Sequence, residues 1–190
     1  MKKKLFSFLL AVWAITFCSA QETFKKTFGA NLNDDAFAIT ETYDGGYLMV
    51  GDTYSFGSGK SDMYIVKFDS AGNKVWDETF GTVDYDHAKA VIQTNDSGFA
   101  IVGVIGSNTS YMSLLKLTKD GTKEWFKYFS GNKRNSANTI VQSYDGGYLL
   151  GGQLSTNDNG SWGYLIKTDK NGDLEWSKKV FGLSFYPEIK

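Results

Sequence analysis

Tyr43-Asp44-Gly45-Gly46-Tyr47-Leu48 is the first of three related hexapeptides that recur about every 50 residues along the chain. The second is Asn95-Asp96-Ser97-Gly98-Phe99-Ala100, and the third is Tyr144-Asp145-Gly146-Gly147-Tyr148-Leu149. Each hexapeptide is followed by an apolar segment with one Lys, and then by a Gly with a Trp four residues later: Tyr64 to Phe68 with Gly72 and Trp76, Ser113 to Leu117 with Gly121 and Trp125, and Tyr164 to Thr168 with Gly172 and Trp176. These markers, in the same order each time, establish an internal repeat.

Each repeat predicts four short β-strands, because β-branched and aromatic residues alternate with turns rich in Asp and Gly. None of these stretches has apolar residues at helical spacing over ten or more residues. We expect Gly46 and Gly147 to take positive φ in the first turn, so that Val at either position costs about 1–3 kcal/mol. The predicted ranges are 36–42, 88–94 and 137–143 for strand one, 47–52, 99–104 and 148–153 for strand two, 64–68, 113–117 and 164–168 for strand three, and 74–80, 123–129 and 174–180 for strand four.

Four-stranded units of this length predict an all-β fold of β-propeller-like blades, which stack because one small sheet cannot bury itself. The blades span about residues 30–80, 81–129 and 130–181. The small residues Ala36, Ala88 and Ala137 open strand one, as suits the crowded axis of a propeller, and we expect the Trp and Phe of strand four to lie between blades. A β-solenoid is the alternative, although its repeats are usually shorter.

The segment 24–29 resembles 76–81 and therefore reads as a spare fourth strand at the start of the domain. Three blades are fewer than the roughly 4–8 of closed propellers. We therefore expect an incomplete propeller, which is either a piece of a longer repeat chain or an open arc that closes by self-association. In either case, further blades or a second copy are the expected partners.

The repeat also resembles a known family. Asp62 to Trp76, with the following Phe80-Gly81, is similar to the secreted bacterial β-propeller repeats of SBBP type and to the Asp-Gly-Gly-Tyr repeats of Bacteroidetes surface and secreted proteins. The resemblance covers residues 24–182. It implies a propeller fold and export, and it implies no reaction.

Residues 1–20 have the layout of a secretory signal peptide, with three Lys, an apolar run from Leu5 to Phe17, and Ala20 before the expected cleavage site. A transmembrane anchor and lipidation at Cys18 are the alternatives. Cleavage removes the only Cys and three of the 20 basic residues, so residues 21–190 carry a net charge of −4. We expect a secreted or periplasmic protein with no transmembrane anchor, and the charge argues against a nucleic-acid partner.

Three patterns suggest chemistry, and each has a simpler reading. Asp169-Lys170-Asn171-Gly172-Asp173 resembles a calcium loop, but it stands where each repeat has a glycine turn. A sialidase would need several arginines, and Arg134 is the only one. His87, the only His, would have to serve any Ser-His-Asp arrangement, with Asp84 and Asp86 beside it; it reads more simply as a solvated loop residue. We therefore predict no catalytic residue, no cofactor and no metal site.

The two ends of the blades differ in sequence. The Asp-Gly turns and the turns between strands three and four are near-identical in all three copies, whereas the other two connections diverge. Function generally lies on loops held by a rigid scaffold. We therefore predict a non-catalytic module that binds a glycan, a polymer or a protein through the variable loops; a segment of a carbohydrate-active enzyme and a structural spacer are the alternatives. The candidate ligand-binding residues are Asp34, Asp35, Tyr54, Asp84, Asp86, His87, Arg134 and Trp162.

Overall fold

The computed structural model describes residues 27–129, 134–155 and 160–183, and every regular element within them is a strand. The described residues contain no helix, and so none that could cross a membrane. The predicted signal peptide lies outside these ranges, as do residues 24–26 of the spare strand. The strands are β1 (Asp34–Glu41), β2 (Tyr47–Thr53), β3 (Asp62–Phe68), β4 (Lys74–Phe80), β5 (Asp86–Gln93), β6 (Phe99–Ile105), β7 (Tyr111–Leu117), β8 (Lys123–Phe129), β9 (Asn135–Gln142), β10 (Tyr148–Ser155), β11 (Ser161–Thr168) and β12 (Leu174–Leu183).

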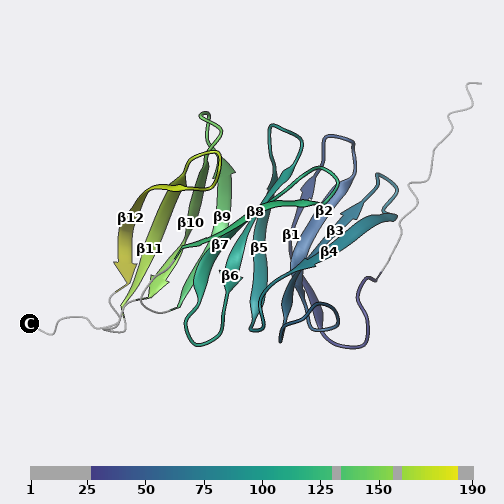
Figure 1. Cartoon of the computed structure of the whole chain (residues 1–190), viewed down its shortest axis with the longest axis horizontal. Helices are drawn as coiled ribbons and strands as arrows, with labels where there is room; N and C mark the ends of the chain where they lie inside the picture. Colours follow the sequence, from purple (N-terminus) through teal and green to yellow (C-terminus); the bar gives the residue numbers. More distant parts are fainter. Residues whose placement is uncertain (1–26, 130–133, 156–159, 184–190) are drawn as a thin grey trace, which may run out of the picture.

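The strands form three separate four-stranded antiparallel sheets, in the orders β1-β2-β3-β4, β5-β6-β7-β8 and β9-β10-β11-β12. We call them blades 1, 2 and 3. They stand side by side, with blade 2 in the middle and strands β5 and β9 against the preceding blade (Figure 1). The predicted all-β fold of three four-stranded repeats is confirmed, and the described blades do not close into a ring. Two of the predicted fourth strands, 74–80 and 123–129, match β4 and β8 residue for residue.

Two hydrophobic cores lie between blades, and a third cluster, of Tyr64, Val66 and Phe68, belongs to blade 1 alone. One core joins Leu48 and Ile65 of blade 1 to Phe99 and Leu117 of blade 2, and a second joins blade 2 to blade 3 in the same way. The aromatic residues of strand four contribute to both cores, as predicted: Trp76 and Phe80 to the first, and Trp125 and Phe129 to the second. Because each sheet buries its faces against its neighbours, the blade stack is the unit of stability.

The Trp of each outer strand reaches across to the next blade. The Trp76 and Phe99 rings lie 6.3 Å apart, and the Trp125 and Tyr148 rings lie 5.9 Å apart. The same indole covers a turn glycine of the next blade, since a Cβ atom at Gly172 would lie only 2.7 Å from the Trp125 ring. Glycine at this position therefore lets the two blades approach closely.

A buried Lys joins three strands at the end of each blade where the Asp-Gly turn lies. Lys116 Nζ donates to the Leu117 carbonyl oxygen at 3.1 Å, to Asp96 in the turn and, at 2.7 Å, to Glu124 on β8. Lys167 repeats the arrangement in blade 3 with Asp145 and Glu175. Lys67 of blade 1 contacts Asp44 and the Phe68 carbonyl oxygen, and Val75 stands where the other blades have Glu. We call this end, formed by the β1–β2 and β3–β4 type turns, the constant end.

The prediction that Gly46 and Gly147 take positive φ is wrong. The positive φ falls one residue earlier, at Gly45 (76°), Ser97 (67°) and Gly146 (83°). The second glycine is required for a different reason: a Cβ atom at Gly147 would lie 2.1 Å from the Thr168 carbonyl oxygen and 2.8 Å from Lys167 Nζ. The turn closes on the buried Lys, and a side chain at this position would push the two apart.

The residues before β1 make contacts like those at the end of a blade's fourth strand. Phe28 packs on Phe68 with ring centroids 4.6 Å apart, in the way that Phe80 packs on the next blade. The Ala30 N–H donates to Asp34 just as the Thr82 N–H donates to Asp86. Residues 27–29 thus occupy, on blade 1, the position that a preceding blade's fourth strand would take, although they form no strand themselves.

Candidate functional site: the groove at the loop end of blade 2

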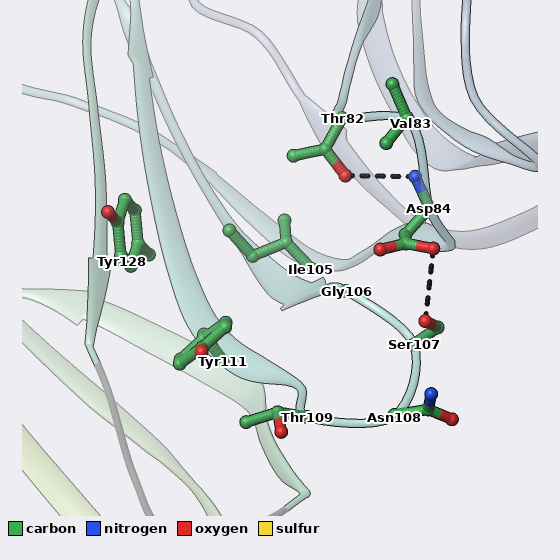
Figure 2. A pocket seen from close by; sticks show the side chains of 10 residues that line it. All are labelled: Thr82, Val83, Asp84, Ile105, Gly106, Ser107, Asn108, Thr109, Tyr111 and Tyr128. Carbon is green, nitrogen blue, oxygen red and sulfur yellow. Dashed lines mark hydrogen bonds between the residues drawn. The ribbon is translucent and has the colours of Figure 1, made fainter.

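A groove of about 660 Å³ opens at the end of blade 2 opposite the constant end, which we call the loop end. Two loops and three strands, β6, β7 and β8, line it (Figure 2). The β4–β5 and β6–β7 connections together supply one polar wall, and Tyr111 and Tyr128 of β7 and β8 stand opposite Asp84. Both connections belong to the loops that the sequence marks as variable. The lining residues are Thr82, Val83, Asp84, Ile105, Gly106, Ser107, Asn108, Thr109, Tyr111 and Tyr128.

Asp84 is held in position at one wall of the groove. Its Oδ1 accepts hydrogen bonds from Lys60 Nζ at 3.1 Å and from Ser107 Oγ at 3.0 Å. The hydrogen bond from Lys60, and after it the one from Ser107, keeps the pKa of Asp84 below its ordinary value. The carboxylate is therefore ionised at neutral pH, and its other oxygen faces the space in front of Ile105 (Figure 2).

The opposite wall is aromatic. Tyr111 and Tyr128 lie on neighbouring strands, with ring centroids 5.7 Å apart and planes inclined by 57°. Tyr111 packs against the core between blades 1 and 2, which fixes its ring. Tyr128 is 61% exposed and presents its ring to solvent. The buried side of Tyr111 and the exposed ring of Tyr128 together form an aromatic surface beside the polar wall, which we call the platform.

Tyr54 lies at the same end of the molecule but on the blade 1 side. Its ring is 6.5 Å from that of Tyr85, and Lys60 Nζ lies 5.0 Å from the centroid of the Tyr85 ring. Lys60 thus contacts both Tyr85 and Asp84. Of the predicted residues, Asp84 lines the groove, and Tyr54 is linked to Asp84 only through Tyr85 and Lys60.

Asp34 and Asp86 hold backbone in place. Asp34 accepts from the Thr53 and Ser55 hydroxyls and from the Ala30 N–H. Asp86 is fully buried, and its two oxygens accept from the N–H groups of Thr82 and Gly106. Asp86 thus fixes both loops that carry the groove, whereas Asp34 fixes the connections at the loop end of blade 1, and neither carboxylate lines the groove.

His87 lies on β5 rather than in a solvated loop, and its side chain faces blade 1. Its Nδ1 is 3.0 Å from Asp52 Oδ2, and the Asp52 side chain is buried. The pair is an ion pair whenever the imidazole is protonated, and it joins two blades. Asp35, next to the irregularity in β1, is exposed.

The other two predicted residues belong to blade 3. Arg134 is exposed, and its carbonyl oxygen accepts from the Ser155 N–H at 3.2 Å. Trp162 stands at the β11 position that Tyr111 holds in β7, and Lys179 Nζ lies 5.4 Å from its ring centroid. The structure does not bring these residues into the groove of blade 2.

Sequence reasoning missed the two tyrosines of the platform and the polar residues Ser107 and Asn108. Ser107 and Asn108 lie in the connection between strands two and three of the second repeat, one of the connections that diverge between repeats, so this divergence was sufficient to include them. Tyr128 had been assigned to a fourth strand of the repeat, where aromatic residues face the next blade. Its alternate position along β8 turns it outward instead.

The groove offers binding chemistry and little acid–base chemistry. Of the described residues that line it, Asp84 is the one carboxylate, whereas glycoside hydrolysis commonly uses two. In the described part of the chain, no three His, Cys, Asp or Glu side chains gather as metal ligands. The calcium-like loop at Asp169 is a turn in which Asp169 Oδ1 accepts from the N–H groups of Asn171 and Asp173.

No protein-family model matches this chain, and no curated protein sequence matches it either.

Proposed function

We propose that the protein is an exported, non-catalytic module that binds a glycan in the groove of blade 2. The observation that supports this most strongly is the Tyr111–Tyr128 platform, which faces a wall of hydrogen-bonding side chains. A sugar ring has an apolar face of C–H groups and a rim of hydroxyls. Tyr128 suits the apolar face, while Asp84, Ser107 and Asn108 suit the hydroxyls.

The groove is also of suitable size and polarity. Ligand sites are typically concave spaces of about 300–1,000 Å³ in which a few polar groups fix the orientation of an otherwise apolar contact. Asp84 is paired with Lys60, and the described residues that line the groove include no Lys or Arg that could bind a carboxylate or sulfate of the ligand, so a neutral sugar suits the groove better than an anionic one. Neutral polysaccharide is therefore the ligand class that we infer.

The test is binding of the mature chain to a panel of neutral and anionic polysaccharides, measured by affinity electrophoresis and calorimetry. Tyr128→Ala is expected to weaken binding at least tenfold, and Asp84→Asn to weaken binding to neutral glycans. Tyr144→Ala is the matched control, because Tyr144 is a fully exposed tyrosine at the constant end. If the wild type binds none of the panel, or if Tyr144→Ala weakens binding as much as Tyr128→Ala, the glycan site is not in this groove.

A further inference from the structure

A second hollow adjoins the groove, on the side of β8 that faces blade 3. It has a volume of about 330 Å³ and lies between β8 of blade 2 and strands β11 and β12 of blade 3. We call it the side hollow. Tyr128 lines both spaces, so the groove and the side hollow meet at this residue. The lining residues that matter here are Lys127, Tyr128, Tyr164, Ile166, Asp173 and Ser177.

The floor of the side hollow is apolar and its rim is polar. Ile166 is buried in the core between blades 2 and 3, and Tyr164 packs against that core. The Tyr164 hydroxyl donates to Ser177 Oγ at 2.7 Å, and Ser177 is exposed. The side hollow thus offers a ring and hydroxyls to a ligand, which is the combination that the groove offers through Tyr128 and Ser107.

A lysine is paired with the carboxylate in each space. In the side hollow, Lys127 Nζ donates to Asp173 Oδ1 at 2.7 Å. Beside the groove, Lys60 Nζ donates to Asp84 Oδ1 at 3.1 Å. An ammonium group has three N–H donors, of which the contact with Asp173 uses one. Because both carboxylates are paired, a chain that runs through both spaces meets little net charge, as suits a neutral glycan.

The corresponding hollow between blades 1 and 2 has no such connection to the groove. It measures about 230 Å³, and none of the described residues that line it also lines the groove. Thr79 stands there in the place of Tyr128. Tyr128 therefore distinguishes the two hollows, and the groove continues past it toward blade 3.

We propose that one glycan chain occupies the groove and the side hollow together and crosses β8 at Tyr128. Resting on the proposed glycan-binding function, this assignment makes the ligand a polymer rather than a short sugar. A chain that is already held in the groove reaches the side hollow at a high effective concentration, so the second contact raises the affinity without a second encounter. A short sugar held in the groove makes no contact in the side hollow.

The test is the dependence of affinity on chain length, measured by calorimetry with the mature chain. The probes are the disaccharides and hexasaccharides of cellulose, xylan, mannan and amylose. For the glycan that binds, we expect the hexasaccharide to bind at least about tenfold more tightly than the disaccharide.

Two variants of the side hollow identify the source of this preference. Lys127→Ala removes N–H donors from its rim, and Ser177→Met fills it. Each variant is expected to reduce the preference for the hexasaccharide to less than about threefold. Lys74→Ala is the matched control, because it removes the Lys of another exposed pair, with Asp77 on blade 1, and should keep the full preference. Thermal melting confirms that all three variants are folded.

The outcomes separate this extension from the proposed function itself. If the wild type binds neither chain length of any probe, the proposed function fails and the extension fails with it. If the wild type binds both lengths equally, binding in the groove stands and the extension is overturned. A longer chain also has more registers in which to bind, but that advantage persists in the variants. The extension is therefore equally overturned if Lys127→Ala and Ser177→Met keep the preference of the wild type.

Discussion

The constant end and the loop end of each blade are formed by the same strands, but the residues at the constant end recur from blade to blade and those at the loop end differ. At the constant end a buried Lys joins an Asp, a backbone carbonyl oxygen and, in blades 2 and 3, a Glu, so the same contacts recur from blade to blade. At the loop end the equivalent position at the start of the third strand is Asp62 in blade 1, Tyr111 in blade 2 and Trp162, the second residue of β11, in blade 3. The contacts of the buried Lys recur from blade to blade, whereas the position at the start of the third strand has a different residue in each blade.

The neighbouring strand shows the same difference. Thr79, Tyr128 and Lys179 occupy equivalent places in the fourth strands, and only blade 2 pairs two aromatic residues across this edge. The aromatic wall of the groove is thus specific to blade 2, although all three blades have the same arrangement of strands. Substitutions at the constant end should change stability, and substitutions at the loop end should change binding.

The largest effect is expected at the second glycine of the turn. Gly147→Ala should destabilise the protein by about 2–4 kcal/mol, because its Cβ would meet the Thr168 carbonyl oxygen at 2.1 Å and the backbone has to move. Gly146→Ala is the matched variant: it is strained by a φ of 83° but has only a distant neighbour, and it should cost about 1 kcal/mol. Urea unfolding measures both, and the reverse order would contradict the close contact with the buried Lys.

The next effect is that of the Lys itself. Lys116→Met should cost about 1–3 kcal/mol, since it keeps the apolar stem and removes the hydrogen bonds to Asp96, Glu124 and the Leu117 carbonyl oxygen. Lys67→Met should cost less, because Val75 stands in place of the Glu in blade 1. If Lys116→Met and Lys67→Met lower the free energy of unfolding equally, the hydrogen bond to Glu124 adds nothing to stability.

Acid is expected to destabilise the protein by protonating carboxylates at the constant end. Hydrogen bonds from Thr42, then from the Gly46 N–H and from Lys67, lower the pKa of Asp44 to about 2, and the hydrogen bond from Lys167 lowers the pKa of Asp145. Their contribution to stability is therefore complete above the unfolded pKa of about 4 and is lost as the pH falls toward 2. The melting temperature of the wild type should fall in this window. The double variant Asp44→Asn/Asp145→Asn, less stable at neutral pH, should fall less steeply; an equal slope would assign the acid sensitivity to other carboxyl groups.

The smallest effect on stability is expected at the loop end. Tyr128→Ala should change the free energy of unfolding by no more than about 0.5 kcal/mol, because the ring is largely exposed. The same variant should lose glycan binding. A large loss of stability would mean that the platform is part of the core, and the contrast between the two ends would then fail.

The repeat made much of the fold predictable. The spacing of the Asp-Gly turn, the Lys segment and the Gly–Trp pair predicted twelve strands in three sheets, and the strands match it closely at β4 and β8. The prediction of stacked blades also led us to expect Trp76 and Trp125 of strand four between blades, where they lie. These features follow from local rules, because turn residues and the two-residue period of a strand act within a few residues of one another.

Contacts between distant residues were not predictable in the same way. The sequence of the turn contains two glycines, and only the packed structure showed that they have different roles. Gly146 has the positive φ, whereas Gly147 leaves room for Lys167 and Thr168, about 20 residues later. Likewise, Asp86 and Asp84 are neighbours in one acidic loop, and burial alone separates a carboxylate that holds backbone from one that faces the groove.

The sequence by itself therefore determined the number of blades, the order of their strands and the end at which the loops diverge. Only the tertiary structure decided which of those loops make a groove, since Tyr111, Tyr128 and Asp84 meet through strand pairing and blade stacking. Strand order is encoded in short-range periodicity, whereas a groove depends on the three-dimensional register of segments that the sequence keeps apart.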